Sequence, residues 1–240
     1  MTTGCHPEMG AVAEWVWLGR VSYQPALELQ EEIRNEILAG HRRDTLLLLE
    51  HPAVITLGRH ADPAHVLLPK SDLCARGIEV CRTSRGGDVT FHGPGQLVGY
   101  PIFRLRRGVR AHMQAMATSL VEWLGGLGLA AEWRPSTPGV WVGSEKICAF
   151  GVHVRHRIAT HGFALNLSPD MDGFSTIVPC GLQNAGVTSL HRQIGNAPAP
   201  EAAARSLIRL FEKNFGVQLV EVRVLGCNRT ASLSRIMEAS

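Results

Sequence analysis

The chain has 240 residues and a mass of 26.1 kDa; 45% of the residues are hydrophobic and 19% are charged. This composition excludes a disordered chain, a coiled coil and a collagen, and the length suits one large domain. The formal net charge is only +3, from 24 Lys and Arg against 21 Asp and Glu, so we predict no nucleic-acid partner. The first ten residues lack the basic start and apolar run of a signal peptide, and no apolar stretch is long enough to span a membrane. We therefore expect a cytoplasmic protein with no membrane partner.

Six cysteines are scattered along the chain without any Cys-x-x-Cys spacing. Zinc sites and disulfide frameworks both need closely grouped cysteines, so neither is predicted. We expect reduced thiols, of which at most one or two carry chemistry. The six are Cys5, Cys74, Cys81, Cys148, Cys180 and Cys227.

Apolar periodicity predicts three helices among a larger number of strands. In chain order we predict a strand at 15–18, a helix at 25–39, strands at 45–49, 54–57 and 77–83, a helix at 113–127, strands at 139–142, 146–154 and 160–167, a helix at 202–215 and a strand at 217–224. Many strands are neighbours along the chain, so the sheet should be mixed and largely antiparallel, with helices covering it. The predicted fold class is α/β or α+β.

The domain organisation is predicted to be simple. No internal repeat, low-complexity segment or linker divides the chain, so we expect a single domain over residues 1–225. The tail at 226–240 has a weak pattern and is predicted to be loose. Within the domain, His51 and Pro52 split two apolar runs, which we interpret as buried strands around a turn.

The segment at 85–101 is richer in glycine than turns require, with glycines at 86, 87, 93, 95 and 99. Gly86 and Gly87 would let backbone amides approach an anionic or carbonyl group, with a charge from Arg85. His92 and Gln96 add side-chain donors. The spacing matches neither a Walker loop nor a Rossmann fingerprint. The alternative interpretation is a glycine-rich surface loop with a solvated Arg85.

The string RGGDVTFHGPGQLVGYPI at 85–102 resembles the signature of the lipoyl(octanoyl) transferase family. The resemblance extends in family order to EHPAVITLGRHA at 50–61, GVWVGSEKICAFG at 139–151, HGFALNL at 161–167 and FSTIVPCGLQNAGVTSL at 174–190. It implies the mixed, helix-flanked sheet of the biotin and lipoate protein ligase catalytic domains. It also implies transfer of an octanoyl group from octanoyl-acyl carrier protein to a lysine of a lipoyl domain, without a cofactor. The acceptors would be lipoyl domains of 2-oxoacid dehydrogenases and the glycine cleavage H protein.

The resemblance makes Cys180 the nucleophile and Lys146 its activating partner. An acyl thioester passes readily to another thiol, but only the thiolate attacks well. Thiol and amine must therefore exchange a proton. Burial would favour a neutral pair, whereas mutual attraction would favour a thiolate–ammonium pair, and both states remain open at this point.

Cys148 departs from the family pattern, which has a small residue such as Ala there. On a strand, Lys146 and Cys148 would project to the same face. We expect Cys148 to be a bystander that could compete with Cys180 for the acyl group only to a small extent.

The resemblance also implies a set of residues that hold the acyl chain and its carbonyl. His92 would either assist proton movement or brace the loop. The grouping of His153, His156 and His161 suggests no metal site, since no acidic ligand accompanies it. The implied binding residues are Arg85, Gly86, Gly87, Asp88, Val89, Thr90, Phe91, His92, Ala149, Phe150, Gly151, Gly162, Phe163 and Ala164.

Two other functions fit parts of the pattern. An ATP-dependent lipoate–protein ligase would share the fold, a glycine-rich loop and a lysine, but would need no nucleophilic cysteine. The Pro-Cys-Gly sequence at 179–181 favours the transferase. A noncatalytic binder of lipoyl domains or carrier proteins would have no reason to keep both Cys180 and Lys146.

Overall fold

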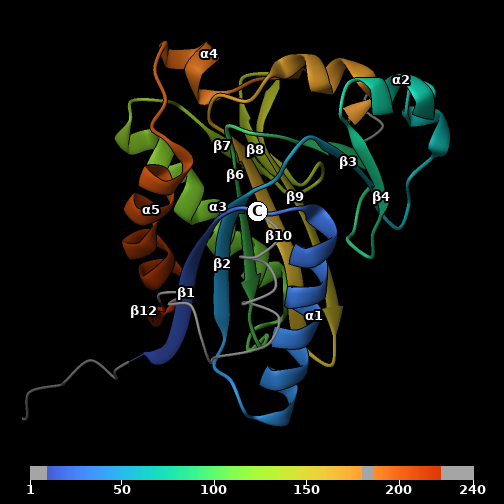
Figure 1. Ribbon diagram of the computed structural model, residues 1–240. Coiled ribbons are helices and arrows are strands. Elements are labelled where there is room, and N and C mark those ends of the chain that lie inside the picture. The colour runs from blue at the N-terminus through green and yellow to red at the C-terminus, as the bar shows by residue number, and fades with distance from the viewer. Residues whose placement is uncertain (1–9, 180–185, 223–240) are drawn as a thin grey trace, which may run out of the picture.

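The computed structural model describes residues 10–179 and 186–222 and contains two β-sheets with helices around them (Figure 1). Most predicted elements are confirmed within a few residues at their ends. The N-terminal half contains β1 (Ala11–Arg20), α1 (Tyr23–Ala39), β2 (Thr45–Glu50), β3 (Val54–Leu57), the 3-10 turn η1 (Pro63–His65), α2 (Lys70–Ala75), β4 (Glu79–Arg82), β5 (Val89–His92) and β6 (Gln96–Ile102). The C-terminal half contains α3 (Gly108–Gly126), β7 (Glu132–Arg134), β8 (Gly139–Val142), β9 (Glu145–Arg155), β10 (Ile158–Asn166), η2 (Met171–Thr176), β11 (Gly186–Val187), α4 (Leu190–Ile194), α5 (Pro200–Phe215) and β12 (Val217–Glu221).

The large sheet has the order β12-β1-β2-β6-β10-β9-β8-β7, with β11 paired to β9. The β12–β1, β1–β2 and β11–β9 pairs are parallel, and the others in this sheet are antiparallel. The small sheet has the order β4-β3-β5. The predicted fold class, a mixed and largely antiparallel sheet flanked by helices, is confirmed. The tail at 226–240 lies outside the described residues.

Both faces of the large sheet are covered. Strand β2 shows how, because its leucines alternate between the two faces. Leu46 and Leu48 pack in the core cluster shared with α3 and α5, whereas Leu47 and Leu49 pack against α1. Figure 1 shows α1 on one side of the sheet and α3 and α5 on the other. A strand buried on both faces is apolar at every position, which explains the continuous leucine run.

The turn at His51 connects two sheets rather than two strands of one sheet. β2 belongs to the large sheet and β3 to the small one. The two buried strands were predicted correctly, but local sequence could not indicate their different partners. The small sheet has its own apolar cluster, formed with α2 and η2.

Strand β6 lies in the middle of the large sheet although its sequence contains Gly99 and Pro101. Proline is rare in a central strand because it cannot donate a ladder hydrogen bond. Gly99 provides space for the ring of Phe163, whose Cε1 would lie 2.2 Å from an added Cβ. The sequence pattern hid this strand inside the glycine-rich segment.

The strands predicted at 146–154 and 160–167 are confirmed as β9 and β10, which form a hairpin whose turn has no glycine. His156 and Arg157 both have positive φ, 51° and 61°. Two such central residues give the turn type that matches the twist of a hairpin, usually with Asn or Gly. None of the helices in the described residues is long and apolar enough to span a membrane.

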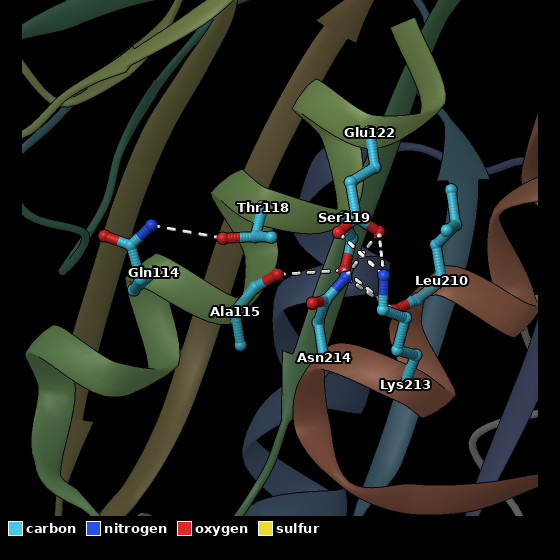
Figure 2. Close-up of polar contacts among 8 residues, drawn as sticks. All are labelled: Gln114, Ala115, Thr118, Ser119, Glu122, Leu210, Lys213 and Asn214. Atoms are coloured by element: carbon cyan, nitrogen blue, oxygen red, sulfur yellow. Dashed lines mark hydrogen bonds and ion pairs between the residues drawn. The ribbon is translucent and has the colours of Figure 1, made fainter. Parts of the chain in front are cut away.

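Helices α3 and α5 are joined by a polar cluster (Figure 2). The hydroxyl of the fully buried Ser119 lies 2.8 Å from the carbonyl oxygen of Ala115 and 3.1 Å from that of Leu210. It also accepts a hydrogen bond from Nδ2 of Asn214 at 3.3 Å. Lys213 forms a more exposed ion pair with Glu122, and such pairs contribute little to stability. Ser119 is therefore a buried polar contact between the two helices, beside the bond from Nε1 of Trp123 to Oγ of Ser206 at 2.8 Å.

We expect Ser119→Ala to lower the free energy of unfolding by about 1 kcal/mol, because the buried hydroxyl loses its partners across the interface. Thr118→Ala, one residue away on the outer side of α3, should change it by less than about 0.5 kcal/mol. Urea unfolding of both variants measures the difference. Equal effects would contradict the importance assigned to Ser119.

Candidate active site

A cavity of about 450 Å³ lies between the β9–β10 hairpin and the loop that precedes β5. Its lining contains Lys146 and all the predicted binding residues except Val89 and Phe91. Three motifs that are far apart in the sequence thus meet at one cavity. The predicted binding residues in the lining are Arg85, Gly86, Gly87, Asp88, Thr90, His92, Ala149, Phe150, Gly151, Gly162, Phe163 and Ala164.

Strand alternation keeps two predicted binding residues out of the cavity. Thr90 and His92 line it, whereas Val89 and Phe91 belong to the apolar cluster of the small sheet. Phe91 packs edge-on against Phe174 with ring centroids 5.3 Å apart. This corrects the expectation that the side chains of the whole segment 85–92 line the cavity.

Arg85 organises the loop and is only 8% exposed. Its Nε donates to Oγ1 of Thr56 at 3.0 Å, and its Nη2 donates to the carbonyl oxygens of Thr56 at 2.6 Å and Asp88 at 2.7 Å. A guanidinium can be buried only if its donors find partners. These bonds hold the loop against β3, so the alternative of a solvated arginine on a surface loop is wrong.

The loop glycines allow close contacts between backbone segments. The amide of Gly86 donates to the carbonyl oxygen of Val152 in β9 at 3.0 Å. A Cβ added at Gly58 would lie 2.3 Å from the carbonyl oxygen of Gly87. The close backbone approach that the sequence predicted exists here between protein segments. Because the Gly86 amide already has a partner, we do not assign it to a substrate carbonyl.

Aromatic and histidine side chains form one wall of the cavity. Behind the wall, Nδ1 of His51 lies 2.6 Å from the carbonyl oxygen of Val21, and Nε2 lies 2.7 Å from the hydroxyl of Tyr100. A carbonyl oxygen can only accept, so His51 carries its proton on Nδ1 and accepts from Tyr100 through Nε2. Tyr23 stacks on His92 with ring centroids 6.1 Å apart. Sequence patterns alone did not indicate that Tyr23 and Tyr100 belong to the cavity.

These histidines are neutral at physiological pH. Burial lowers the pKa of His92 to about 3, and neighbouring His51 adds to the effect. Burial likewise lowers the pKa of His51 to about 4 and that of His161 to about 3, with a further decrease at His161 from Arg85. The wall therefore offers hydrogen-bonding groups without positive charge from its imidazoles.

His161 occupies a strained position inside β10. Its φ is 58°, uncommon for a residue other than glycine. The amide of His161 donates to Oε1 of Gln30 at 2.7 Å, and its Nε2 lies 3.2 Å from Oγ of Ser84. Such a conformation persists only where surrounding contacts impose it. His161 thus supports the segment that leads into Arg85.

Within residues 10–179 and 186–222, no group of three or more His, Cys, Asp or Glu side chains could hold a metal ion.

Lys146 lies near the start of β9 and is 8% exposed. Its Nζ lies 4.9 Å from the ring centroid of Trp141, a cation–π distance. Gly139 lies against the lysine side chain, since an added Cβ would approach its Cε to 3.0 Å. The carbonyl oxygen of Lys146 accepts from the amide of Thr188 at 3.0 Å. Lys146 is therefore a buried, closely packed residue of the cavity wall and not a solvated lysine.

Cys180 lies outside the described residues. Pro179 precedes it, and β11 begins six positions after it, at Gly186. β11 pairs in parallel with the start of β9, with Gly186 opposite Glu145 and Val187 opposite Lys146. The described chain after Cys180 thus runs beside Lys146.

Cys148 does not share the cavity with Lys146. It is fully buried in the core cluster with Val140 and Leu165 and is absent from the cavity lining. The β8–β9 register shifts between Val140 and Trp141, which face Cys148 and Lys146 respectively. Burial raises the pKa of the Cys148 thiol well above its ordinary value, and the charge of Lys146 opposes this only partly. A buried thiol of this kind is a poor nucleophile.

Sequence reasoning missed several residues of the cavity lining. His60, Tyr100 and His161 lie inside the quoted motifs but outside the residues that the resemblance implied for binding. The other missed residues lie in a helix, a strand or a short turn without a family motif. The missed residues are Tyr23, His60, Tyr100, Met113, Ser136, Thr137, Pro138, Val152 and His161.

Residues 22–212 match the family model described as the lipoyl protein ligase A/B catalytic domain, and the chain belongs to this family. The crystal structure of lipoate-protein ligase A bound with ATP has a TM-score of 0.76 and 17% sequence identity, covering 95% of this chain and 93% of that one. The bipartite lipoate protein ligase of Thermoplasma acidophilum has a TM-score of 0.71, also at 17% identity, covering 95% of this chain and 91% of that one. At such identities the similarity shows the fold alone.

Within this family, the chain is similar in sequence to octanoyltransferases. The octanoyltransferase of Chloroflexus aurantiacus is 44% identical over 208 residues, covering 84% of this chain and 93% of the relative. That of Alkaliphilus metalliredigens is 40% identical over 208 residues, covering 85% of this chain and 95% of the relative. The family resemblance seen in the sequence motifs is confirmed.

The buried histidines make stability depend on pH. His51, His92, His112 and His161 have pKa values of about 3 to 4 in the folded protein against an ordinary 6.5. Between these values the unfolded chain binds more protons, so stability is lost as the pH falls from 6.5 toward 4. The loss should reach about 1.4 kcal/mol per pH unit for each histidine.

We expect unfolding at pH 5 to take up about four protons through these side chains, measured by calorimetry in buffers of different ionisation enthalpy. His112→Phe should reduce the uptake by about one proton, whereas the exposed His191→Asn should leave it unchanged. Unfolding without proton uptake at pH 5 would contradict neutral burial of these histidines.

Proposed function

We propose that this chain is an octanoyltransferase that moves an octanoyl group from octanoyl-acyl carrier protein to a lysine of a lipoyl domain through a thioester on Cys180. The observation that carries the proposal is the position of Lys146. Lys146 is buried in the wall of a largely apolar cavity. Strand β11, which follows Cys180 in the sequence, pairs with β9, the strand that contains Lys146. The 44% identical relative named octanoyltransferase supports the same activity.

The first half-reaction exchanges one thioester for another. Cys180 transfers its proton to Lys146 and attacks the acyl carbonyl as a thiolate, so an S–C bond forms to Cys180 and the S–C bond to the donor thiol breaks. Lys146 then returns the proton to the departing thiolate. Bonds broken and formed are alike, so the exchange needs no cofactor.

The second half-reaction makes the amide. The amine of the acceptor lysine attacks the thioester, an N–C bond forms, and the S–C bond to Cys180 breaks. The proton lost by the amine returns to the sulfur, with Lys146 as carrier. Phe150, Phe163, Met113 and Pro138 provide apolar surface for the acyl chain.

The acceptors in this proposal are lipoyl domains of 2-oxoacid dehydrogenases and the glycine cleavage H protein, and the reaction takes place in the cytoplasm. The bipartite ligase of Thermoplasma acidophilum forms a lipoylation system with its E2 lipoyl domain, which supports this class of acceptor. The catalytic unit is assigned to residues 1–225. ATP-dependent ligation is the second candidate, because the ligase with bound ATP has the same fold.

Incubation with octanoyl-acyl carrier protein without ATP distinguishes these functions. We expect one octanoyl adduct in the intact mass, sensitive to hydroxylamine as a thioester is. A ligase would form no covalent adduct, because its acyl-adenylate is not attached to the protein, and it would instead need free octanoate and ATP to modify a lipoyl domain. Absence of an adduct would therefore favour a ligase or a binding role.

Removal of the two candidate cysteines tests the nucleophile. Cys180→Ala should abolish the adduct, whereas Cys148→Ala should retain it, because the thiol of Cys148 is fully buried with a raised pKa. Intact mass spectrometry after exposure to the donor measures both. An adduct retained by Cys180→Ala would refute the assignment of the nucleophile.

Replacement of the lysine tests the base. Lys146→Met should slow acylation of the enzyme by about 10²- to 10⁴-fold, the range typical of a lost general base. Lys70→Met, at an exposed position in α2, is the matched control and should change the rate by less than twofold. Quenched-flow measurement of the adduct gives both rates. Equal rates for the two variants would exclude a proton-transfer role for Lys146.

A further inference from the structure

A chain of buried side-chain amides runs from the cavity to the strand that follows Cys180. Nδ1 of His92 lies 2.7 Å from Oε1 of Gln96. Nε2 of Gln96 lies 2.8 Å from Oδ1 of Asn166 and 3.3 Å from the carbonyl oxygen of Phe91. Nδ2 of Asn166 lies 2.9 Å from the carbonyl oxygen of Thr188. His92, Gln96 and Asn166 are at most 6% exposed, so solvent competes little for these bonds.

The direction of every bond in this chain follows from its far end. The carbonyl oxygen of Thr188 can only accept, so Asn166 must turn its amide nitrogen toward Thr188 and its oxygen toward Gln96. Gln96 must then turn its nitrogen toward Asn166. The carbonyl oxygen of Phe91, also only an acceptor, requires the same orientation. The oxygen of Gln96 is consequently left to accept from His92.

These orientations determine the tautomer of His92. Its proton lies on Nδ1 and is donated to Gln96, so Nε2 carries a lone pair. Because His92 lines the cavity and its Nδ1 is bonded to Gln96, Nε2 is the ring nitrogen left for a ligand. Burial and the neighbouring His51, Arg85 and His161 lower the pKa of His92 to about 3, so the lone pair persists at physiological pH.

The same chain reaches the strand of Lys146. The amide of Thr188 donates to the carbonyl oxygen of Lys146 at 3.0 Å. Nε2 of Gln193 donates to Oγ1 of Thr188 at 2.9 Å and lies 3.2 Å from Oε2 of Glu145. The group that faces the cavity at His92 and the strand that carries Lys146 are thus connected through consecutive hydrogen bonds.

We propose that Gln96 and Asn166 are positioning residues that hold His92 as its Nδ1–H tautomer, so that Nε2 accepts a hydrogen bond from the N–H of the incoming amine. This inference rests on the proposed octanoyl transfer to an amine. By accepting from one N–H, His92 orients the nitrogen lone pair toward the thioester carbonyl. In the first half-reaction the attacking atom is the sulfur of Cys180, which carries no N–H. That half-reaction therefore does not need this hydrogen bond.

The tautomer is tested directly in the wild-type protein, without any assay of activity. Long-range ¹H–¹⁵N spectra distinguish a protonated from an unprotonated imidazole nitrogen. We expect the His92 ring to show a protonated Nδ1 and an unprotonated Nε2 from pH 5 to 8, with assignment from the spectrum of His92→Asn. A protonated Nε2 would overturn the inference, whether or not the protein transfers octanoyl groups.

Gln96→Glu tests the role in the reaction. Its carboxylate can accept from Nδ1 of His92 but cannot donate to Asn166, and its charge should raise the pKa of His92 by one unit or more. The groups that face His92 and could also respond are Tyr23, His51, Arg85 and His161. Gln114→Glu, at an exposed position in α3, adds the same charge and is the matched control.

The two half-reactions are measured separately with isolated acyl-enzyme. For Gln96→Glu, which keeps an acceptor for the Nδ1–H of His92, we expect transfer to the amine to be lost as the pH falls through the raised pKa of His92, because the protonated ring has no lone pair on Nε2. Acylation should show no such loss. Equal slowing of both half-reactions, with an unshifted pH profile, would reduce Gln96 to a structural role and overturn the inference. Failure of the wild type to form an acyl-enzyme would instead refute the proposed function.

Discussion

The buried guanidinium of Arg85 is the constraint on which the geometry of the cavity depends. It connects β3 of the small sheet to the loop that covers the cavity, through bonds to the hydroxyl and carbonyl oxygens of Thr56 and the carbonyl oxygen of Asp88. A charge taken out of water is stable only with such partners, so the loop has little freedom to move away. Gly86 and Gly87 serve this arrangement because they let the loop backbone lie directly against β9 and Gly58. The sequence motif suggested that the charge of Arg85 binds a substrate. In the structure, this charge instead stabilises the contact between the loop and β3.

The cavity that results combines apolar surface with hydrogen-bonding groups that carry no charge. Burial keeps His51, His92 and His161 neutral, and the tyrosines beside them hold their protons for the same reason, since burial raises the pKa of Tyr23 and Tyr100. A neutral wall suits an acyl chain, which gains from leaving water but offers no charge to bind. Lys146 lies in the same lining, with its Nζ over the ring of Trp141. In the proposed reaction, acyl binding and proton transfer thus use different parts of one cavity.

Sequence patterns predicted much of the fold, and they failed where partners are distant. The helices α1 and α5 and the strands β9 and β10 were predicted because their apolar patterns depend on residues close in sequence. Strand β6 was hidden, since Gly99 and Pro101 are unusual in a central strand. The ring of Phe163 fills the space above Gly99. The turn at His156 was also unrecognised, because it adopts positive φ without glycine. The assignment of β2 and β3 to different sheets depends on pairing that no local pattern contains.

The sequence by itself determined the fold class, the family and the three motifs that supply most of the cavity lining, because these depend on residue types at fixed spacing. Tertiary structure alone decided which side chains face the cavity. It turned Val89 and Phe91 into the core of the small sheet, buried Cys148 away from the lining, and added Tyr23 and Tyr100, which were not predicted to line the cavity. It also set the direction of the amide chain from Thr188 to His92, which no single segment encodes. The physical reason is that alternation, burial and hydrogen-bond direction depend on which strands pair, and pairing is a property of the whole chain.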